Sequence, residues 1–127
     1  MIEIIKFMFS EEKLMKEAFS IRKKVFVIEQ DVSEEEEYEY EEESTHFLLR
    51  YNKTPVATAR YRKTKEGIKL ERFAVLQKYR GKGIGFKILE SMLYDLKDNT
   101  SLKYMHAQIQ VVPFYEKAGF KKDNGLF

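Results

Sequence analysis

The sequence has no cysteine, and its only two histidines, His46 and His106, lie far apart. Without cysteine the chain has no disulfide framework, no thiolate nucleophile and no cysteine-based metal site. Two distant histidines do not have the spacing of a histidine-based metal site, so we expect no metal. Both fall in predicted strands, where we expect half-buried histidines with satisfied hydrogen bonds rather than catalytic groups.

Long apolar runs are also missing. Residues 1–13, "MIEIIKFMFSEEK", contain a short apolar stretch with charges inside it, which is too short for a signal peptide or a membrane span. We therefore expect a cytoplasmic protein that does not bind membranes. The length of 127 residues and the hydrophobic content of 43% predict one globular domain over residues 1–127.

The net charge of +2 hides an uneven distribution of charge along the chain. Residues 29–43 hold ten of the 21 carboxylates and no Lys or Arg, which is typical of a solvated loop. The remaining residues carry 23 basic and 11 acidic side chains. This basic surplus favours a polyanionic ligand, either a nucleic acid or a phosphorylated cofactor.

The hydrophobic pattern predicts an α+β domain with one mixed, mostly antiparallel sheet. We expect a first helix with Ser10 as its N-cap, because Leu14, Ala18, Ile21, Val25 and Ile28 recur at helical spacing up to about residue 28. Turn residues separate apolar, β-branched stretches elsewhere. The predicted order is β-α-β-β-β-α-β-α, with strands at 2–9, 45–51, 56–63, 68–75 and 104–112 and later helices at 83–97 and 113–119.

The segment "YRGKGIGFKILE", residues 79–90, places three of the six glycines between a predicted strand and a predicted helix. A glycine-rich turn before a helix gathers backbone N–H groups, and the helix dipole adds positive potential there. A missing Cβ lets a pyrophosphate contact the backbone, and Arg80 and Lys82 would add charge at the rim. The alternative is a flexible turn with a helix cap, for which one glycine would suffice.

Two common phosphate loops do not match this segment. The Walker loop needs the pattern G-x-x-x-x-G-K-[ST], which is absent. The dinucleotide fingerprint needs G-x-G-x-x-G after the first strand of a βαβ unit, whereas this segment has G-x-G-x-G and follows the fourth predicted strand.

The glycine segment does match the pattern [QR]-x-x-G-x-[GA], through Arg80, Gly83 and Gly85. With the preceding "LERFAV" and the later "FYEKAGF", it resembles the GNAT superfamily of acetyl-CoA-dependent N-acetyltransferases, and it is similar to the ElaA-like branch. The resemblance spans roughly residues 20–121. It implies helices on both faces of the sheet and fourth and fifth strands that splay apart around the cofactor.

The resemblance also implies a cofactor site for acetyl-CoA as co-substrate. Backbone groups of Phe73 and Val75 would pair with the pantetheine arm, and a bulge beside Ala74 would point an N–H group at the thioester carbonyl. Gln108 would hold the pantetheine or the splayed strand. The pyrophosphate would lie on the glycine turn, and the full implied set is Phe73, Ala74, Val75, Arg80, Gly81, Lys82, Gly83, Ile84, Gly85, Phe86, Gln108 and Phe114.

Two residues are candidates for catalysis. Tyr115 matches the tyrosine that protonates the departing thiolate in many GNAT enzymes; alternatively it packs the short helix beside Phe114. Glu71 is the candidate general base, because strand alternation would place it on one face with Phe73 and Val75. Its alternative is a surface carboxylate paired with Arg60 or Arg72.

These features predict an N-acetyltransferase in which a primary amine, on a small molecule or a peptide, attacks the bound thioester directly, with no acyl-enzyme. A non-catalytic acetyl-CoA-binding sensor or scaffold is the alternative. We do not expect nucleic-acid binding, because the Lys and Arg residues are dispersed and no base-reading motif is present. If the acidic run borders the acceptor cleft, it favours a cationic acceptor such as a polyamine or a lysine-like amine.

The sequence ends at "KKDNGLF", where GNAT domains usually continue through a further strand. We therefore expect a shortened C-terminus, whose last strand is missing, is supplied by a partner, or lies outside this sequence. A homodimer is one way to supply it.

Overall fold

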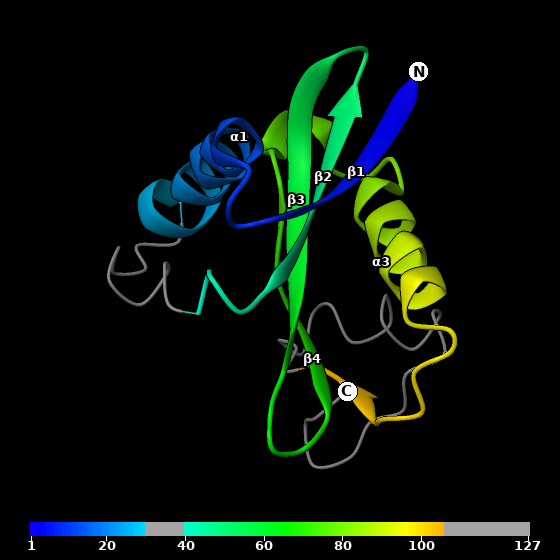
Figure 1. The fold of residues 1–127 in the computed structure, drawn as a ribbon. Coiled ribbons are helices and arrows are strands. Elements are labelled where there is room, and N and C mark those ends of the chain that lie inside the picture. The colour runs from blue at the N-terminus through cyan, green and yellow to red at the C-terminus, as the bar shows by residue number, and fades with distance from the viewer. Residues whose placement is uncertain (30–39, 106–127) are drawn as a thin grey trace.

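The computed structural model describes residues 1–29 and 40–105. A five-stranded sheet, in the order β1-β2-β3-β4-β5, separates two helices (Figure 1). The helix α1 (Glu12–Arg22) covers one face and α3 (Ile84–Asp95) covers the other. The strands are β1 (Ile2–Met8), β2 (Thr45–Tyr51), β3 (Thr54–Lys63), β4 (Ile68–Val75) and β5 (Lys103–Tyr104).

The first four strands form the antiparallel meander that the sequence predicts, and their ends agree with the predictions within two residues. The turn between β2 and β3 is two residues long, and Asn52 and Lys53 both have positive φ angles, of 49° and 70°. Such a turn matches the right-handed twist of the strands on either side, which keeps the two strands in register.

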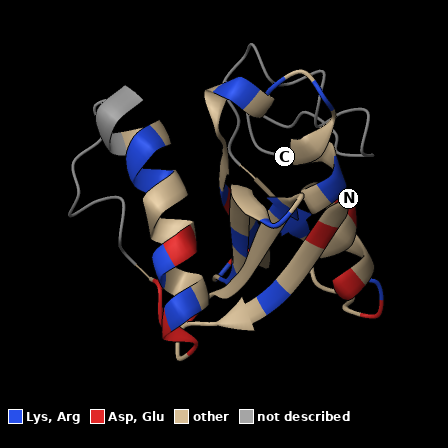
Figure 2. Ribbon diagram, turned by 90° about the horizontal axis from the view of Figure 1, so that it is seen from above, with Lys and Arg blue, Asp and Glu red and all other residues tan. Residues whose placement is uncertain are grey.

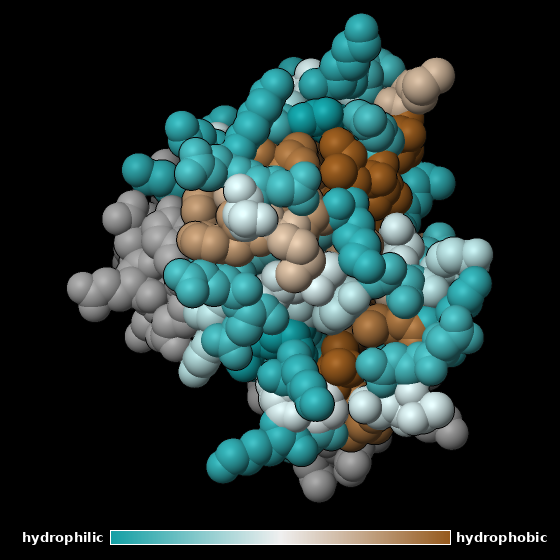
Figure 3. All heavy atoms as spheres, viewed as in Figure 1, coloured by the Kyte–Doolittle hydropathy of each residue, from teal (hydrophilic) through white to brown (hydrophobic). Residues whose placement is uncertain are grey.

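Side chains alternate between two apolar cores along each strand. On β2, Phe47 and Leu49 pack with α3, while Leu48 packs with α1. This alternation explains how one strand contributes to both cores, and it confirms the prediction of helices on both faces. Figure 3 shows further hydrophobic side chains along β1, whose first residue, Ile2, is exposed.

The first helix differs from its prediction at both ends. Glu11, not Ser10, occupies the N-cap, because the Glu11 carbonyl accepts the first helical hydrogen bond, from the Met15 N–H. The Glu11 carboxylate accepts a hydrogen bond from the Met8 N–H in the turn before the helix. At the other end α1 stops at Arg22, and a π-helical segment, η1 (Lys23–Glu29), continues the chain. Helical backbone therefore reaches the predicted end near residue 28, but its last part has the wider hydrogen-bond spacing of a π-helix.

The C-terminal part of the described chain makes the sheet mixed. β5 pairs in parallel with β4, through Ile68 with Lys103 and Lys69 with Tyr104. The predicted strand at 104–112 therefore begins one residue early, while its remainder beyond residue 105, the predicted splay and the predicted helix at 113–119 lie outside the described residues. Of the helices that the structure describes, none is long and apolar enough to cross a membrane.

Candidate active site

The glycine turn connects β4 to α3. A short 3-10 turn, η2 (Gln77–Tyr79), follows β4, and the chain then passes through Gly81 and Gly83 into the helix. Gly81 has a φ of 80° and Gly83, the N-cap of α3, has a φ of 74°. These left-handed angles are strained for residues with a Cβ, so the backbone conformation itself requires glycine at both positions.

The turn is also open to an approaching ligand. A Cβ built on Gly81 or Gly83 would meet no atom within 4 Å. Within the part of the chain that the structure describes, no side chain forms a cap hydrogen bond at the start of α3. The first N–H groups of a helix have no partner within the helix itself. An anion fits such a place, because it can touch the main chain and interact with the positive end of the helix dipole.

Positive charge surrounds the turn. Residues 72–89 contain five Lys and Arg and no acidic residue, and Figure 2 shows Lys and Arg along η2 and the turn that follows it. The Arg80 Nε donates a hydrogen bond of 2.9 Å to the Val75 carbonyl, so its guanidinium group is tied to the end of β4. The ammonium group of Lys82 lies 5.9 Å from the centre of the Tyr79 ring. Both cations thus stay beside the open turn.

A β-bulge interrupts the pairing of β3 with β4 where the sequence predicts one, beside Ala74. Arg60 pairs with Glu71 and Thr58 with Ala74, so two residues of β4 lie opposite the single residue Ala59 of β3. Arg72, in the bulge, has a left-handed φ of 57°. A non-glycine residue held at such an angle inside a strand is a local strain of the kind that gathers at functional sites.

The bulge corrects the predicted face of Glu71. Phe73 and Val75 pack against the α3-side core, whereas Ala74 belongs to the α1-side core. Glu71 pairs with Arg60, whose guanidinium group reaches residues on the α1 side. The extra residue shifts the phase of the strand, so Glu71 does not share a face with Phe73 and Val75 as strict alternation predicts.

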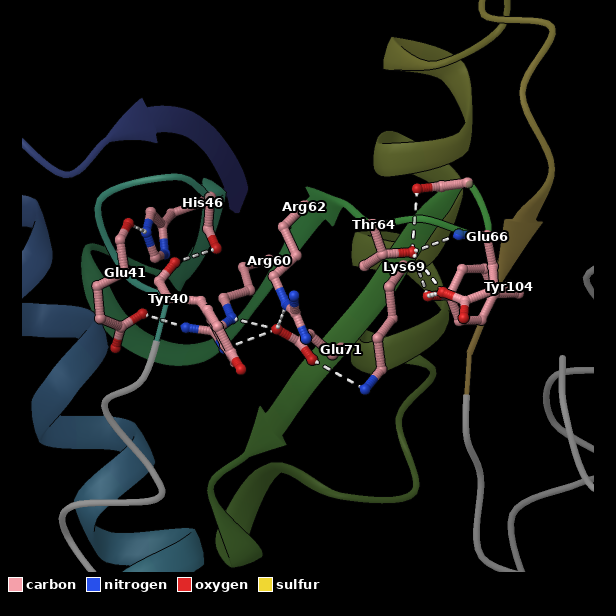
Figure 4. Close-up of polar contacts among 12 residues, drawn as sticks. Tyr40, Glu41, His46, Arg60, Arg62, Thr64, Glu66, Lys69, Glu71 and Tyr104 are labelled. Atoms are coloured by element: carbon pink, nitrogen blue, oxygen red, sulfur yellow. Dashed lines mark hydrogen bonds and ion pairs between the residues drawn. The ribbon is translucent and has the colours of Figure 1, made fainter.

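Glu71 lies in a group of ion pairs on the α1 face (Figure 4). Its Oε2 accepts hydrogen bonds of 2.8 Å from the Nε atoms of both Arg60 and Arg62, and it lies 2.6 Å from a second nitrogen of Arg60. The Lys69 Nζ lies 3.4 Å from Oε1. The alternative that the sequence left open, a carboxylate paired with Arg60, is therefore present, but Glu71 is 12% exposed and is not a surface residue.

The pKa of Glu71 reflects these neighbours. Burial raises it, but the charges of Arg60 and Arg62 and their hydrogen bonds outweigh burial and place the pKa below its ordinary value. A carboxylate with a lowered pKa is a weaker proton acceptor, which argues against a general base. The catalytic role of Glu71 stays a prediction.

The ion pairs continue through a second buried carboxylate, Glu41. Arg22 of α1 donates to Glu41 at 3.1 Å and pairs with its other oxygen at 2.7 Å, and Arg60 also binds Glu41. Arg22 and Arg60 are each 1% exposed and Glu41 is 6% exposed. Together they fasten the segment of residues 40–44 to both α1 and the sheet.

Sequence reasoning missed the role of Glu41, which it assigned to a solvated acidic run. The available signal was the arginines, since Thr58, Arg60 and Arg62 share one face of β3 by alternation, and buried arginine requires a partner. His46 agrees with its expectation: it is buried, stacks on Phe7 and bonds the Glu41 carbonyl through Nε2. Burial lowers its pKa below the ordinary value.

A cavity of about 470 Å³ opens on the same face, between α1 and the segment that carries Glu41. We call it the acidic pocket, and its lining is Phe9, Phe19, Tyr40, Glu41, Glu42 and Glu43. The remaining predicted site residues, Gln108, Phe114 and Tyr115, lie outside the described residues, as does His106.

The fold and the open turn define an α+β protein in which a glycine turn leads from the fourth strand into a helix. The profile of the acetyltransferase (GNAT) domain matches residues 8–126. The uncharacterized N-acetyltransferase YjcF of Bacillus subtilis is 40% identical over 113 residues, which are 87% of this chain and 80% of YjcF. The chain therefore belongs to the GNAT family and is an acyltransferase, as the motifs indicate.

Solved structures show the same fold. Escherichia coli ElaA has a TM-score of 0.84 and 23% identity, over 99% of this chain and 96% of ElaA. An acetyltransferase of Clostridium acetobutylicum, whose structure was solved with acetyl-CoA, has a TM-score of 0.70 and 20% identity, over 98% of this chain and 92% of its own. These likenesses confirm the predicted α+β, GNAT-like fold.

Proposed function

We propose that this protein transfers an acetyl group from acetyl-CoA to the nitrogen of a primary amine by direct attack. In this reaction an N–C bond forms at the thioester carbonyl, the C–S bond breaks, and the proton given up by the amine balances the proton taken by the departing thiolate. GNAT acetyltransferases use acetyl-CoA, and a structural neighbour was solved with it. Direct attack is supported by the absence of cysteine, the residue best suited to carry the acyl group.

One observation carries the donor proposal: the open glycine turn at the start of α3. Gly81 and Gly83 adopt angles that only glycine adopts without strain, and the space where their side chains would lie is empty. An ordinary helix cap needs one such residue. Two of them beside Arg80 and Lys82 favour a diphosphate, whose oxygens would accept hydrogen bonds from the first turn of the helix.

The β4 bulge supports the position of the reacting group. Arg72 is held in a left-handed conformation, and this turns the backbone between Glu71 and Ala74 out of the regular ladder. On the family resemblance, we assign to a backbone N–H beside Ala74 the stabilisation of the negative charge that develops on the acyl oxygen, an effect worth about 3 kcal/mol. We assign the protonation of the departing thiolate to Tyr115, on the family motif.

The test measures donor binding and transfer separately. Gly83→Val places a branched side chain in the open space, and we expect acetyl-CoA affinity, measured by calorimetry, to fall at least about tenfold. Thr100→Val, at an exposed residue far along the chain, is the matched control and should bind normally. Normal affinity in Gly83→Val, with a folded protein, would contradict the proposed donor site.

Acetyl transfer is measured by detecting the coenzyme A thiol that is released with each of a panel of amines. The chain has no thiol of its own, so a thiol reagent reports only the product. Tyr115→Phe should reduce turnover by roughly 10²-fold, the lower range for a lost general acid, and should keep acetyl-CoA affinity. Binding of acetyl-CoA without thiol release from any amine would instead identify a non-catalytic sensor.

A further inference from the structure

We propose that the acidic pocket binds the cationic end of the acceptor, an aliphatic amine that carries a second ammonium group. This inference rests on the proposed function, because it names the substrate class of the same enzyme. The pocket volume of about 470 Å³ lies within the range of small-molecule sites. Its lining combines two features that suit organic cations, aromatic rings and carboxylates.

Aromatic rings form one side of the pocket. Phe9 is 37% exposed and Tyr40 is 46% exposed, although large aromatic side chains usually bury most of their area. Ring faces attract ammonium groups, and cations already use them here: the Arg62 guanidinium lies 4.0 Å from the centre of the Tyr40 ring. Arg62 already covers part of Tyr40, so the aromatic surface left for a ligand is that of Phe9 and the exposed remainder of Tyr40.

The carboxylates of the pocket fall into two groups. Glu41 is held by Arg22 and Arg60, so its charge is balanced inside the protein. Glu42 and Glu43 are exposed, and within residues 1–29 and 40–105 no Lys or Arg forms an ion pair with either of them. The pocket thus presents two negative charges to solvent, which attract a cation and disfavour an anionic acceptor.

The pocket lies on the face that carries the bulge of β4. Phe19 lines the pocket and also packs against the α1-side core that contains Ala74. Tyr40 contacts Arg62, which bonds to Glu71 directly before the bulge. An amine that holds one ammonium group in the pocket therefore lies on the same face of the sheet as Ala74 and Glu71.

The first experiment measures binding without acetyl-CoA, so it does not depend on transfer. Calorimetry compares 1,4-diaminobutane binding to the wild type and to the double variant Glu42→Gln/Glu43→Gln. We expect roughly five- to tenfold weaker binding in the variant, the effect of two partly screened charges. The control Glu90→Gln/Asp98→Asn removes the same charge from exposed positions on and after α3 and should bind like the wild type. Equal binding by all three proteins would overturn the proposal.

The second experiment measures acetylation. For the wild type, we expect the KM for 1,4-diaminobutane to lie well below that for n-butylamine and to rise with salt. In the Glu42/Glu43 variant only the KM for the diamine should rise, with kcat retained, because the pocket holds the part of the acceptor that does not react. Equal KM values for diamine and monoamine in the wild type would refute the assignment.

Two further arms separate the sources of the cation and the two proposals. A lower KM for 1,4-diaminobutane than for an Nα-acetyl-lysine amide identifies a free polyamine, and the reverse identifies a lysine side chain; both outcomes support a cation pocket. If diamine binding depends on Glu42 and Glu43 but acetyl-CoA does not bind, the proposed function is refuted and the cation pocket is still supported. If acetyl transfer occurs but its KM for the diamine is the same in the wild type and in the Glu42/Glu43 variant, the cation pocket is refuted and the proposed function is still supported.

Discussion

Replacing Glu41 with Gln tests whether the buried ion pairs hold the acidic segment to the sheet. Gln has almost the same shape and keeps one oxygen that accepts hydrogen bonds, but it carries no negative charge. Arg22 and Arg60, both almost completely buried, would then lose the charge that Glu41 supplies between them. Guanidinium groups do not lose their protons in proteins, so this cost cannot be relieved by neutralisation.

The size of the effect follows from burial. Removing one partner of a buried pair typically costs 3–5 kcal/mol, and the retained amide oxygen places the expectation at the lower end, about 3 kcal/mol. For a domain of this length that corresponds to a fall in Tm of about 10 °C. Glu42→Gln, one residue further along and exposed, removes the same charge and should change stability by less than about 0.5 kcal/mol.

The assay is chemical denaturation followed by circular dichroism at pH 7.5, on the full chain. A double-mutant cycle with Arg22→Met should show a coupling energy of at least about 1 kcal/mol, because both variants break the same contact. If Glu41→Gln and Glu42→Gln lose equal stability, or if the cycle shows no coupling, the buried network does not hold this segment and the reasoning fails.

Two further predictions concern β4 and its ends. Glu71→Gln should lower the free energy of unfolding at neutral pH. The variant should keep the acid limb of the pH profile of kcat/KM, and loss of that limb would identify Glu71 as the general base. Because the pKa of Glu71 is lower in the folded protein than its ordinary value of about 4.3, the unfolded chain takes up the proton first as pH falls. This stabilisation is therefore complete above about pH 5 and lost below it, and Glu71→Gln should flatten that part of the stability curve. Gly67→Ala should lower the free energy of unfolding by about 2–3 kcal/mol, because the new Cβ would lie 2.3 Å from the Leu102 carbonyl oxygen. Gly81→Ala, whose Cβ meets no atom within 4 Å, should lower it by about 1 kcal/mol. Equal losses of stability in chemical denaturation would show that backbone strain, and not the contact with Leu102, causes the effect.

The architecture was predictable because local patterns and the tertiary fold agree over most of the described chain. Apolar, β-branched stretches between turn residues predict β2 and β4 to the residue and β1 and β3 within two residues. The glycine turn was predictable for the same reason, since its backbone angles are a local property. Errors at the start of α1 arose because Ser10 and Glu11 compete for one cap, and the hydrogen bond from the Met15 N–H to the Glu11 carbonyl decides between them.

The site residues were harder to predict than the strands, because their surroundings depend on contacts between residues far apart in the sequence. The pattern identified Glu71 but gave it the wrong face, because the extra residue of the bulge reverses alternation after it. It placed Glu41 in a solvated run, whereas two arginines from α1 and β3 bury it. Neither feature has a signature within a few residues of its own position.

The sequence by itself determined the order and period of the strands and helices, the glycine-rich turn, and the uneven distribution of charge along the chain. Those properties depend on side chains and backbone angles within a few residues of one another. Only the tertiary structure decided which carboxylates are balanced by buried arginines and which face a cavity, because Arg22, Glu41 and Arg60 meet only after α1 packs on the sheet. The same packing buries Glu41 between two arginines and leaves its neighbours Glu42 and Glu43 exposed at the pocket.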